Sequence, residues 1–378
     1  MKLMHLSDLH LGKRLNGFSL LEDQAYILDR IVEAADAERP DAVLIAGDVY
    51  DKPVPPEEAV RLFDGFLYRL FERRLTVFVI SGNHDSAERI AFGSRMMDER
   101  LRFSPAYDGT AVPTVLHDEY GEVRIYSLPF IKPATVRRFF PDREIVSYTD
   151  AMRAAIENMA LEPGVRNVLI AHQFVTGGTR SDSEEISVGG LDNVDAAVFD
   201  PFDYVALGHL HGPQSVGRET LRYCGTPLKY SFSEKDHEKS VTVVELGEKG
   251  KVGLRCLPLS PLRDLRELRG SYDELMLRAN YIGTAVEDYL RVILTDEEEV
   301  YGAMDRLRTV YPNIMALEYD NARSRAAALG EPEAERMESL SEEELFAAFY
   351  EAQNGAPMSE EQMAFSHELF EAVREEMR

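Results

Sequence analysis

Short apolar runs followed by polar residues recur along the first two thirds of the chain. Five of them are KLMHL, DAVLIA, LTVFVI, RNVLIA and DYVALG, which begin at residues 2, 41, 75, 166 and 203. Continuous apolar runs of this length are typical of strands that are covered on both faces. Between the first three runs, residues 22–40 and 55–74 carry apolar positions at helical spacing, and Pro40 ends the first segment. This alternation predicts an α/β layered domain.

The pattern changes after about residue 260. Residues 240–258 predict a hairpin with Gly247 and Gly250 in its turn, and residues 261–325 predict a small α+β cap with the order β-β-α-β. The acidic remainder contains two amphipathic segments with capping-box starts, Ser341 to Glu344 and Ser359 to Gln362. We therefore expect three regions: an α/β domain at 1–260, the cap at 261–325 and a helical partner-binding region at 326–378.

Composition narrows the class of protein. With 378 residues, 44 % hydrophobic and 29 % charged, the chain fits a globular protein of two or three domains. We expect no membrane contact, because no apolar run approaches the length of a transmembrane helix, and the N-terminus lacks a signal-peptide pattern. Two cysteines without paired spacing favour a reducing cytoplasm. The net charge of −25 argues against nucleic-acid binding by this chain alone, unless bound cations or a basic partner offset it.

Residues of the types that bind metal ions follow each of the five apolar runs. In an open α/β sheet, functional side chains gather beyond the carboxyl ends of the strands, and residues two apart on an extended segment project to the same side. Carboxylate, amide and imidazole ligands suit Mn²⁺ or Fe²⁺. Seven ligands exceed the need of one ion, so a two-ion site with Asp48 as the shared bridge is expected. The candidate ligands are Asp8, His10, Asp48, Asn83, His172, His209 and His211.

Each cluster has a plainer interpretation when it is taken alone. A single buried histidine is more often a hydrogen-bonded core residue than a ligand, and "GD" after a strand is common. "GNHD" is more specific, and five such clusters after five apolar runs make coincidence a poor explanation. The remaining histidines are assigned to ordinary structure: His5, His117, His237 and His367.

The order D-x-H, GD, GNHD, H and GHxH resembles the calcineurin-like metallophosphoesterase superfamily over roughly residues 1–230. The resemblance implies a four-layer sandwich of two central β-sheets flanked by helices. It implies a first ion held by Asp8, His10, Asp48 and His211, and a second held by Asp48, Asn83, His172 and His209. His84 would donate a proton to the leaving oxygen, and Asp85 would orient its imidazole and keep it protonated.

Further stretches are similar to the bacterial SbcD (Mre11-type) nuclease-subunit family: "GDVYDKPVPPEEAV", "SGNHDSAERIAFGS" and "YCGTPLKYSFSE". That similarity implies a DNA phosphodiesterase with two Mn²⁺ ions per chain, Mg²⁺ or Fe²⁺ being the other options. It implies 3′-to-5′ exonuclease activity on duplex ends and endonuclease activity on single strands and hairpins, in DNA repair and recombination. It also implies a homodimer within a heterotetramer that contains an SbcC/Rad50-type ATPase.

Two other functions stay open on the sequence. One is a small-molecule or cyclic phosphodiesterase of the same superfamily, which would cleave simple diesters far faster than DNA. The other is a scaffold that keeps the fold without catalysis, which would not bind two ions per chain. The complete set of ligand types and the presence of His84 argue against the scaffold.

Overall fold

The computed structural model describes residues 1–184, 192–322, 324–325, 342–354 and 356–376. The chain divides into two compact units, Met1–Leu265 and Arg266–Arg378. Each unit is described below by itself.

The first unit contains a six-stranded sheet whose centre is parallel. Its order is β14-β13-β1-β4-β5-β6, with β1, β4, β5 and β6 parallel and β13 and β14 antiparallel. The hairpin expected at residues 240–258 is present, and Gly250 in its turn has a φ of 80°. The strands are β1 (Lys2–Leu6), β4 (Ala42–Ala46), β5 (Thr76–Ile80), β6 (Leu101–Phe103), β13 (Ser240–Leu246) and β14 (Val252–Pro258).

A second six-stranded sheet has the order β11-β12-β10-β9-β8-β7. Strands β8, β9, β10 and β12 are parallel, whereas β7 and β11 pair antiparallel at the two edges. The strands are β7 (Thr114–Asp118), β8 (Gly121–Ser127), β9 (Arg166–His172), β10 (Tyr204–Gly208), β11 (Gln214–Val216) and β12 (Arg218–Tyr223).

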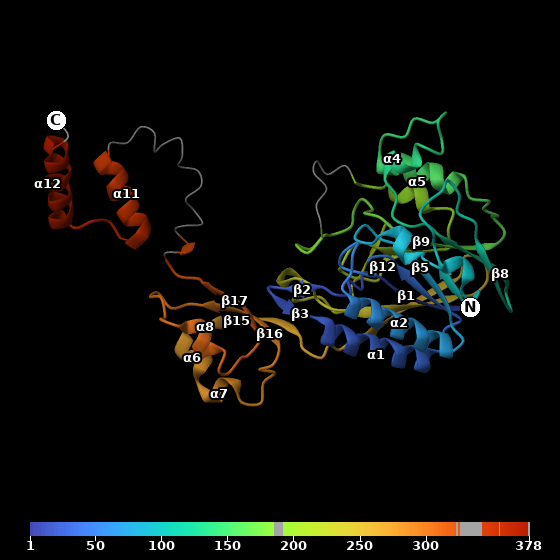
Figure 1. Ribbon diagram of the computed structural model, residues 1–378, viewed down its shortest axis with the longest axis horizontal. Helices are drawn as coiled ribbons and strands as arrows, with labels where there is room; N and C mark the ends of the chain where they lie inside the picture. The colour runs from blue at the N-terminus through green and yellow to red at the C-terminus, as the bar shows by residue number, and fades with distance from the viewer. Residues whose placement is uncertain (185–191, 323, 326–341, 355, 377–378) are drawn as a thin grey trace. The chain divides into compact units, whose positions relative to one another are not determined.

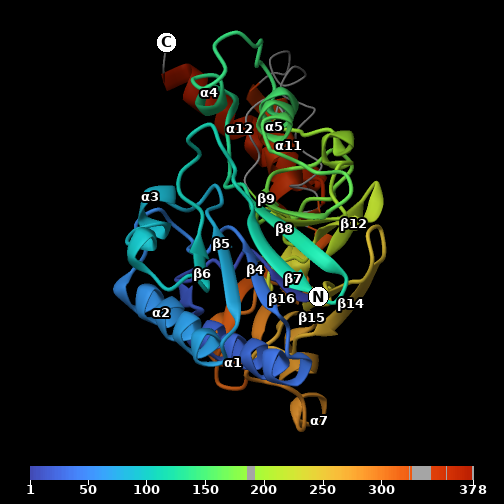
Figure 2. The same cartoon turned by 90° about the vertical axis from the view of Figure 1, so that its right-hand side faces the viewer.

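The two sheets face each other across an apolar core and are flanked by helices. Buried side chains from both sheets fill the space between them, including Leu44, Phe78 and Ile170. Helices α1 (Leu21–Glu38) and α2 (Glu57–Glu72) cover the first sheet; α4 (Pro133–Val136) and α5 (Tyr148–Glu157) lie on the other side, as Figures 1 and 2 show. The predicted four-layer α/β sandwich is confirmed, since helix, sheet, sheet and helix follow in that order.

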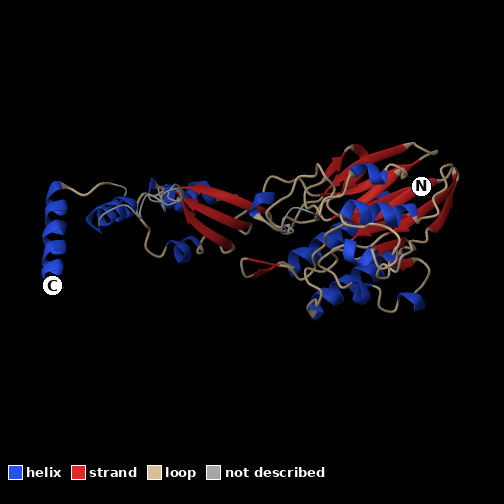
Figure 3. Cartoon of the chain, turned by 90° about the horizontal axis from the view of Figure 1, so that it is seen from above, coloured by secondary structure: helices blue, strands red, loops and turns tan. Residues whose placement is uncertain are grey.

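The remaining described elements of this unit are short connections. They are β2 (Arg14–Leu15), β3 (Phe18–Ser19), α3 (Ala87–Ile90) and the 3₁₀ turns η1 (Ser94–Met96), η2 (Ala196–Phe199) and η3 (Phe232–Glu234). Figure 3 shows the loops that join the strands of the two sheets.

The second unit is built around a three-stranded sheet of order β15-β16-β17. Its elements are β15 (Leu265–Gly270), α6 (Tyr272–Met276), α7 (Arg278–Tyr281), β16 (Tyr289–Leu294), α8 (Ala303–Leu307) and β17 (Ile314–Tyr319). The expected order β-β-α-β therefore missed α6 and α7. Helices of four or five residues depend on tertiary packing more than on sequence periodicity, and Leu275 and Tyr281 pack on the core of this unit.

Two further helices, α11 (Glu342–Asn354) and α12 (Glu360–Glu376), lie where the amphipathic segments predicted them. The Ser359 capping box is confirmed: Gln362 N donates to Ser359 Oγ at 3.3 Å, and Ser359 N donates to Gln362 Oε1 at 2.9 Å. The other predicted cap, Ser341, lies outside the described residues, as does 326–341 of the predicted helical region. Within the described residues, no helix is long and apolar enough to span a bilayer.

Candidate metal centre

The carboxyl ends of five strands carry the predicted ligands. β1, β4 and β5 are parallel neighbours in the first sheet, and β9 and β10 are parallel neighbours in the second. The loops after β1 and β4 run side by side, because Asp8 N donates to Gly47 O at 3.0 Å and His10 N donates to Asp48 O at 2.9 Å. Asp8, His10 and Asp48 are thereby held on neighbouring loops.

The backbone of these loops is strained. Four predicted ligands have a positive φ: Asp8 (52°), His10 (43°), Asp48 (47°) and His209 (107°). This conformation costs a non-glycine residue on the order of 1–3 kcal/mol and persists only where the surroundings enforce it. Such outliers gather at functional sites, and four of them on converging loops indicate one here.

Two glycines in the motifs allow the loops to approach one another. A Cβ on Gly208 would lie 1.9 Å from Ala46 O, and a Cβ on Gly82 would lie 2.1 Å from Asp48 Oδ1. The first contact joins the two sheets, and the second lets the loop after β5 close on Asp48. The glycines in "GHLH" and "GNHD" are therefore required by close packing.

The side chains converge in two overlapping groups. In one, His10 Nε2 lies 3.2 Å from His211 Nε2, and Asp8 completes the set. In the other, His172 Nε2 lies 3.2 Å from Asp48 Oδ2 and 3.0 Å from Asn83 Oδ1. Asn83 Oδ1 is also 2.9 Å from His209 Nδ1. Ligands about 2.1 Å from an ion and at right angles lie roughly 3 Å apart, so these spacings fit divalent cations.

The hydrogen bonding of His172 provides a test that is independent of spacing. Its Nδ1 lies 2.8 Å from the carbonyl oxygen of Ala46, which can only accept, so Nδ1 carries the hydrogen. Its Nε2 faces two further acceptors, Asp48 Oδ2 and Asn83 Oδ1. Without metal a proton on Nε2 satisfies these contacts, and a divalent cation bound between the three atoms would take the place of that proton. The residues present therefore fit a divalent metal ion.

Burial and charge keep the imidazoles and carboxylates in different states. Burial lowers the pKa of His209 to about 3 and holds that of His10 well below its usual value, so both stay neutral. Burial raises the pKa of Asp8 to about 6. Burial alone would also raise the pKa of Asp48 and lower that of His172, but their mutual attraction reverses both. The pKa of Asp48 lies far below its usual value and that of His172 rises to about 9.

His84 lies at the edge of this cluster. Its backbone N–H donates to Asp48 Oδ1 at 2.9 Å, and its Nδ1 lies 3.1 Å from the carbonyl oxygen of Asp51. That carbonyl can only accept, so Nδ1 carries a hydrogen and the ring is fixed by the loop after β4. A ligand atom of His84 also lies within 4.8 Å of atoms of His10 and Asp48. His84 therefore faces the cluster from the loop after β5.

The prediction that Asp85 orients the His84 imidazole is wrong. The Asp85 carboxylate instead accepts hydrogen bonds from three backbone N–H groups, those of Val49, Tyr50 and Gly82, each at 3.0 Å. It therefore joins the loop after β4 to the loop after β5. The His84 ring takes its orientation from the carbonyl of Asp51, three residues after Asp48.

The sequence matches known families over both units. Residues 1–213 match the calcineurin-like phosphoesterase family. The chain belongs to this family. Residues 261–354 match a second family, described as the type 5 capsule protein repressor C-terminal domain. The chain is also 35 % identical, over 322 residues, to the SbcD subunit of nuclease SbcCD from Staphylococcus epidermidis; the match covers 84 % of this chain and 85 % of that protein. It is thus a homologue of the SbcD nuclease subunit.

Solved structures resemble the chain more distantly. A dimetal phosphatase from Danio rerio is 11 % identical with a TM-score of 0.41, covering 69 % of this chain and 98 % of its own. A protein from Thermus thermophilus is 11 % identical with a TM-score of 0.38, covering 68 % and 98 %.

Several residues that support the phosphoesterase loops were missed from the sequence. Gln24 Nε2 donates to His10 O at 2.8 Å, and Tyr230 OH donates to Leu9 O at 2.5 Å, so α1 and the "KYSFSE" segment hold the first ligand loop. Around His211 the missed residues are Ser183, Glu184 and Glu234. The presence of Tyr230 and Glu234 in the quoted "YCGTPLKYSFSE" stretch was the available signal.

Proposed function

We propose that this chain is the two-metal nuclease subunit of a DNA-processing complex, a Mn²⁺-dependent deoxyribonuclease. The observation that carries the proposal is the set of acceptor atoms, from both sheets, that converge around Asp48. The family match and the relative named as a nuclease subunit support it. The complex would act in the cytoplasm, in DNA repair and recombination.

We assign the ligands as the resemblance implied. Asp8, His10, Asp48 and His211 would hold one ion; Asp48, Asn83, His172 and His209 would hold the other. Asp48 is suited to the bridge because its carboxylate lies 3.8 Å from His10 Nε2 and 3.2 Å from His172 Nε2. Two divalent cations bound there supply Lewis-acid activation of water and neutralise charge on the phosphate. Oxygen and nitrogen ligands favour Mn²⁺, with Mg²⁺ or Fe²⁺ as substitutes.

His84 would provide the proton for the leaving oxygen. With Nδ1–H given to Asp51 O, its Nε2 is the free nitrogen of the ring. A protonated Nε2 would donate to the departing 3′ oxygen as the phosphodiester breaks.

The substrate would be DNA, cleaved 3′-to-5′ from duplex ends and internally at single strands and hairpins. The net charge of −25 favours a partner that brings basic DNA-binding surface, and an SbcC/Rad50-type ATPase in a heterotetramer with two copies of this chain would do so. The helices α11 and α12 would bind that partner. Their exposed apolar side chains include Phe349 and Phe365, which are 60 % and 67 % exposed.

The test is Mn²⁺-dependent cleavage of linear duplex DNA beside a simple phosphodiester, with wild type and His84→Gln, each with and without the ATPase and ATP. The proposal predicts DNA degradation that requires Mn²⁺ and His84 and rises with the partner. Cleavage of the small diester with DNA untouched in every reaction would contradict it. That result would establish the small-molecule or cyclic phosphodiesterase, which the acidity of the chain favours.

A further inference from the structure

The outward nitrogen of His211 faces a buried acidic group. Its Nε2 points toward His10 in the ligand cluster, whereas its Nδ1 lies 2.7 Å from Ser183 Oγ and 3.1 Å from Glu234 Oε1. Glu234 has no exposed surface. A carboxylate at this depth is costly unless it is paired and hydrogen-bonded.

Lys239 provides that pairing. Its ammonium lies 2.6 Å from Glu234 Oε2 and also donates to Thr226 Oγ1 at 2.7 Å and to His211 O at 2.9 Å. Lys239 is only 5 % exposed. The ion pair is thus bound to His211 at two points, through the imidazole and through the backbone carbonyl.

The geometry fixes which nitrogen of His211 carries the hydrogen. Ser183 Oγ lies 2.5 Å from Glu234 Oε1, and only the hydroxyl can donate in that bond. Toward His211, both Ser183 and Glu234 therefore accept, and Nδ1 must be the N–H. This leaves the lone pair on Nε2, the nitrogen that faces the cluster.

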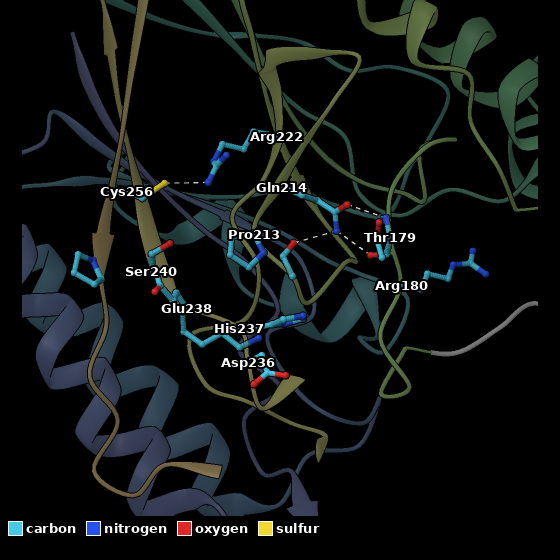
Figure 4. A pocket seen from close by; sticks show the side chains of 13 residues that line it. Thr179, Arg180, Pro213, Gln214, Arg222, Asp236, His237, Glu238, Ser240 and Cys256 are labelled. Atoms are coloured by element: carbon cyan, nitrogen blue, oxygen red, sulfur yellow. Dashed lines mark hydrogen bonds between the residues drawn. The ribbon is translucent and has the colours of Figure 1, made fainter. Parts of the chain in front are cut away.

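The segment that carries Ser183 is itself anchored. Gln214 Nε2 donates to Thr179 O at 2.8 Å, and Thr179 N donates to Gln214 Oε1 at 2.7 Å, as Figure 4 shows on the wall of a cavity of about 650 Å³. Glu184 Oε1 accepts the backbone N–H of His211 at 2.6 Å. Lys239 lines the same cavity, as does Gly212, the residue after His211.

The other half of the cluster is built differently. His172 turns its Nδ1 to the backbone carbonyl of Ala46, a neutral acceptor. A carboxylate behind a ligand imidazole makes the ring a stronger electron donor than a carbonyl does, and loss of such a partner typically weakens metal binding by about 10–100-fold.

We propose that Glu234, held by Lys239, is a positioning residue that sets the affinity of the ion bound by His211 and leaves the ion bound by His172 unchanged. This inference rests on the proposed ligand assignment. It adds a buried ion pair, contributed from outside the ligand loops, that gives the two metal positions different affinities.

The experiment titrates metal-free protein with Mn²⁺ and follows free Mn²⁺ by electron paramagnetic resonance. Wild type should bind two ions. Glu234→Gln should bind one ion about 10–100-fold more weakly and the other as wild type does. Because Glu234→Gln leaves Lys239 buried without its partner, Glu234→Gln/Lys239→Met removes both charges and should show the same split. Circular dichroism melting confirms that each variant is folded.

The matched control is Asp203→Asn. The Asp203 carboxylate also pairs with a lysine, 2.8 Å from Lys249 Nζ, and its side chain is only 4 % exposed, but it contacts the start of β9 and the β13–β14 turn. This variant should lose stability and keep both affinities. If the Glu234 variants are folded and keep both wild-type affinities, the inference is wrong while the two-ion centre stands. If wild type binds no Mn²⁺, the proposed function itself fails.

Discussion

Within the first unit, the space between the two sheets is filled by apolar side chains, whereas the loops at the carboxyl ends of the same strands bury charged and polar ones. The strands have ordinary extended backbones, and four ligand positions in the loops have a positive φ. The inter-sheet core buries apolar side chains on unstrained strands, whereas the ligand loops bury charged side chains on a strained backbone. Such violations are expected where a protein gives up stability for chemistry.

The largest effect is expected from a substitution of Asp48 in the ligand loops. Asp48→Asn removes the charge of the proposed bridge, so both ions should be lost and cleavage should fall by about 10³-fold or more. Atomic absorption on purified protein measures the metal, and a DNA cleavage assay measures activity. Asp36→Asn, on the exposed surface of α1, is the control. Two ions retained by Asp48→Asn would contradict the bridge.

His84→Gln separates binding from catalysis within the loop region. Loss of a general acid should reduce cleavage by about 10²–10⁴-fold, while metal content stays near that of wild type. The same two assays apply, with the exposed His117→Gln on β7 as the control. If His84→Gln loses metal as Asp48→Asn does, His84 is a ligand and its assignment as proton donor is wrong.

Phe78→Ala tests the inter-sheet core in the same way. Phe78 is fully buried on β5, so its truncation should cost about 3–5 kcal/mol of unfolding free energy. The folded fraction should still bind two ions. Urea unfolding and Mn²⁺ titration measure the two effects, and Phe92→Ala, at an 81 % exposed position, should cost under about 0.5 kcal/mol. A Phe78→Ala protein that is stable but binds no metal would mean that core and loops are not separable.

His5 joins the two sheets and gives the core a pH dependence. It is buried, its Nδ1 lies 2.8 Å from Tyr204 OH, and burial lowers its pKa to about 3. Below its unfolded value of 6.5 the unfolded chain takes up a proton and the folded protein does not, so stability falls as pH drops from 6.5 toward 3. From pH 7 to pH 5 the loss should be about 2 kcal/mol. Urea unfolding of the metal-free proteins measures this loss, which should be absent in His5→Gln. An identical pH dependence of the unfolding free energy in wild type and His5→Gln would show that His5 does not cause it.

The smallest effect concerns a positive φ away from the metal loops. Arg39 ends α1 at φ 50° and is exposed. Arg39→Gly should raise the free energy of unfolding by about 0.5–1 kcal/mol, because glycine adopts this conformation without a Cβ clash. Arg61→Gly, inside α2, should lower it by about 1 kcal/mol. Thermal melting distinguishes the two, and a loss of stability in Arg39→Gly would contradict the assumed strain.

Much of this arrangement was predictable from the sequence. Apolar runs locate the strands, and parallel strands bring their carboxyl ends to one edge, so the polar residues that follow Leu6, Ala46 and Ile80 had to converge. The helices α1 and α2 followed from periodicity. The short α6 and α7 did not, since their stability comes from packing on the second unit's core.

Contacts between distant segments were not predictable. Nothing local places Glu234 behind His211, because the chain passes through β11 and β12 before it reaches η3, which contains Glu234. The role of Asp85 was carried over from the family resemblance, whereas three backbone N–H groups bind its carboxylate here. Residue types and strand ends predict a site's composition, and tertiary folding decides which side chain orients which.

We propose that strained loops of both sheets hold two ions through one shared carboxylate. A crystal structure of the protein grown with Mn²⁺, with anomalous scattering data, tests it most directly. We expect two anomalous peaks a few ångströms apart, bridged by Asp48, with His211 beside one and His172 beside the other. A single peak, or ions held without Asp48, would contradict it.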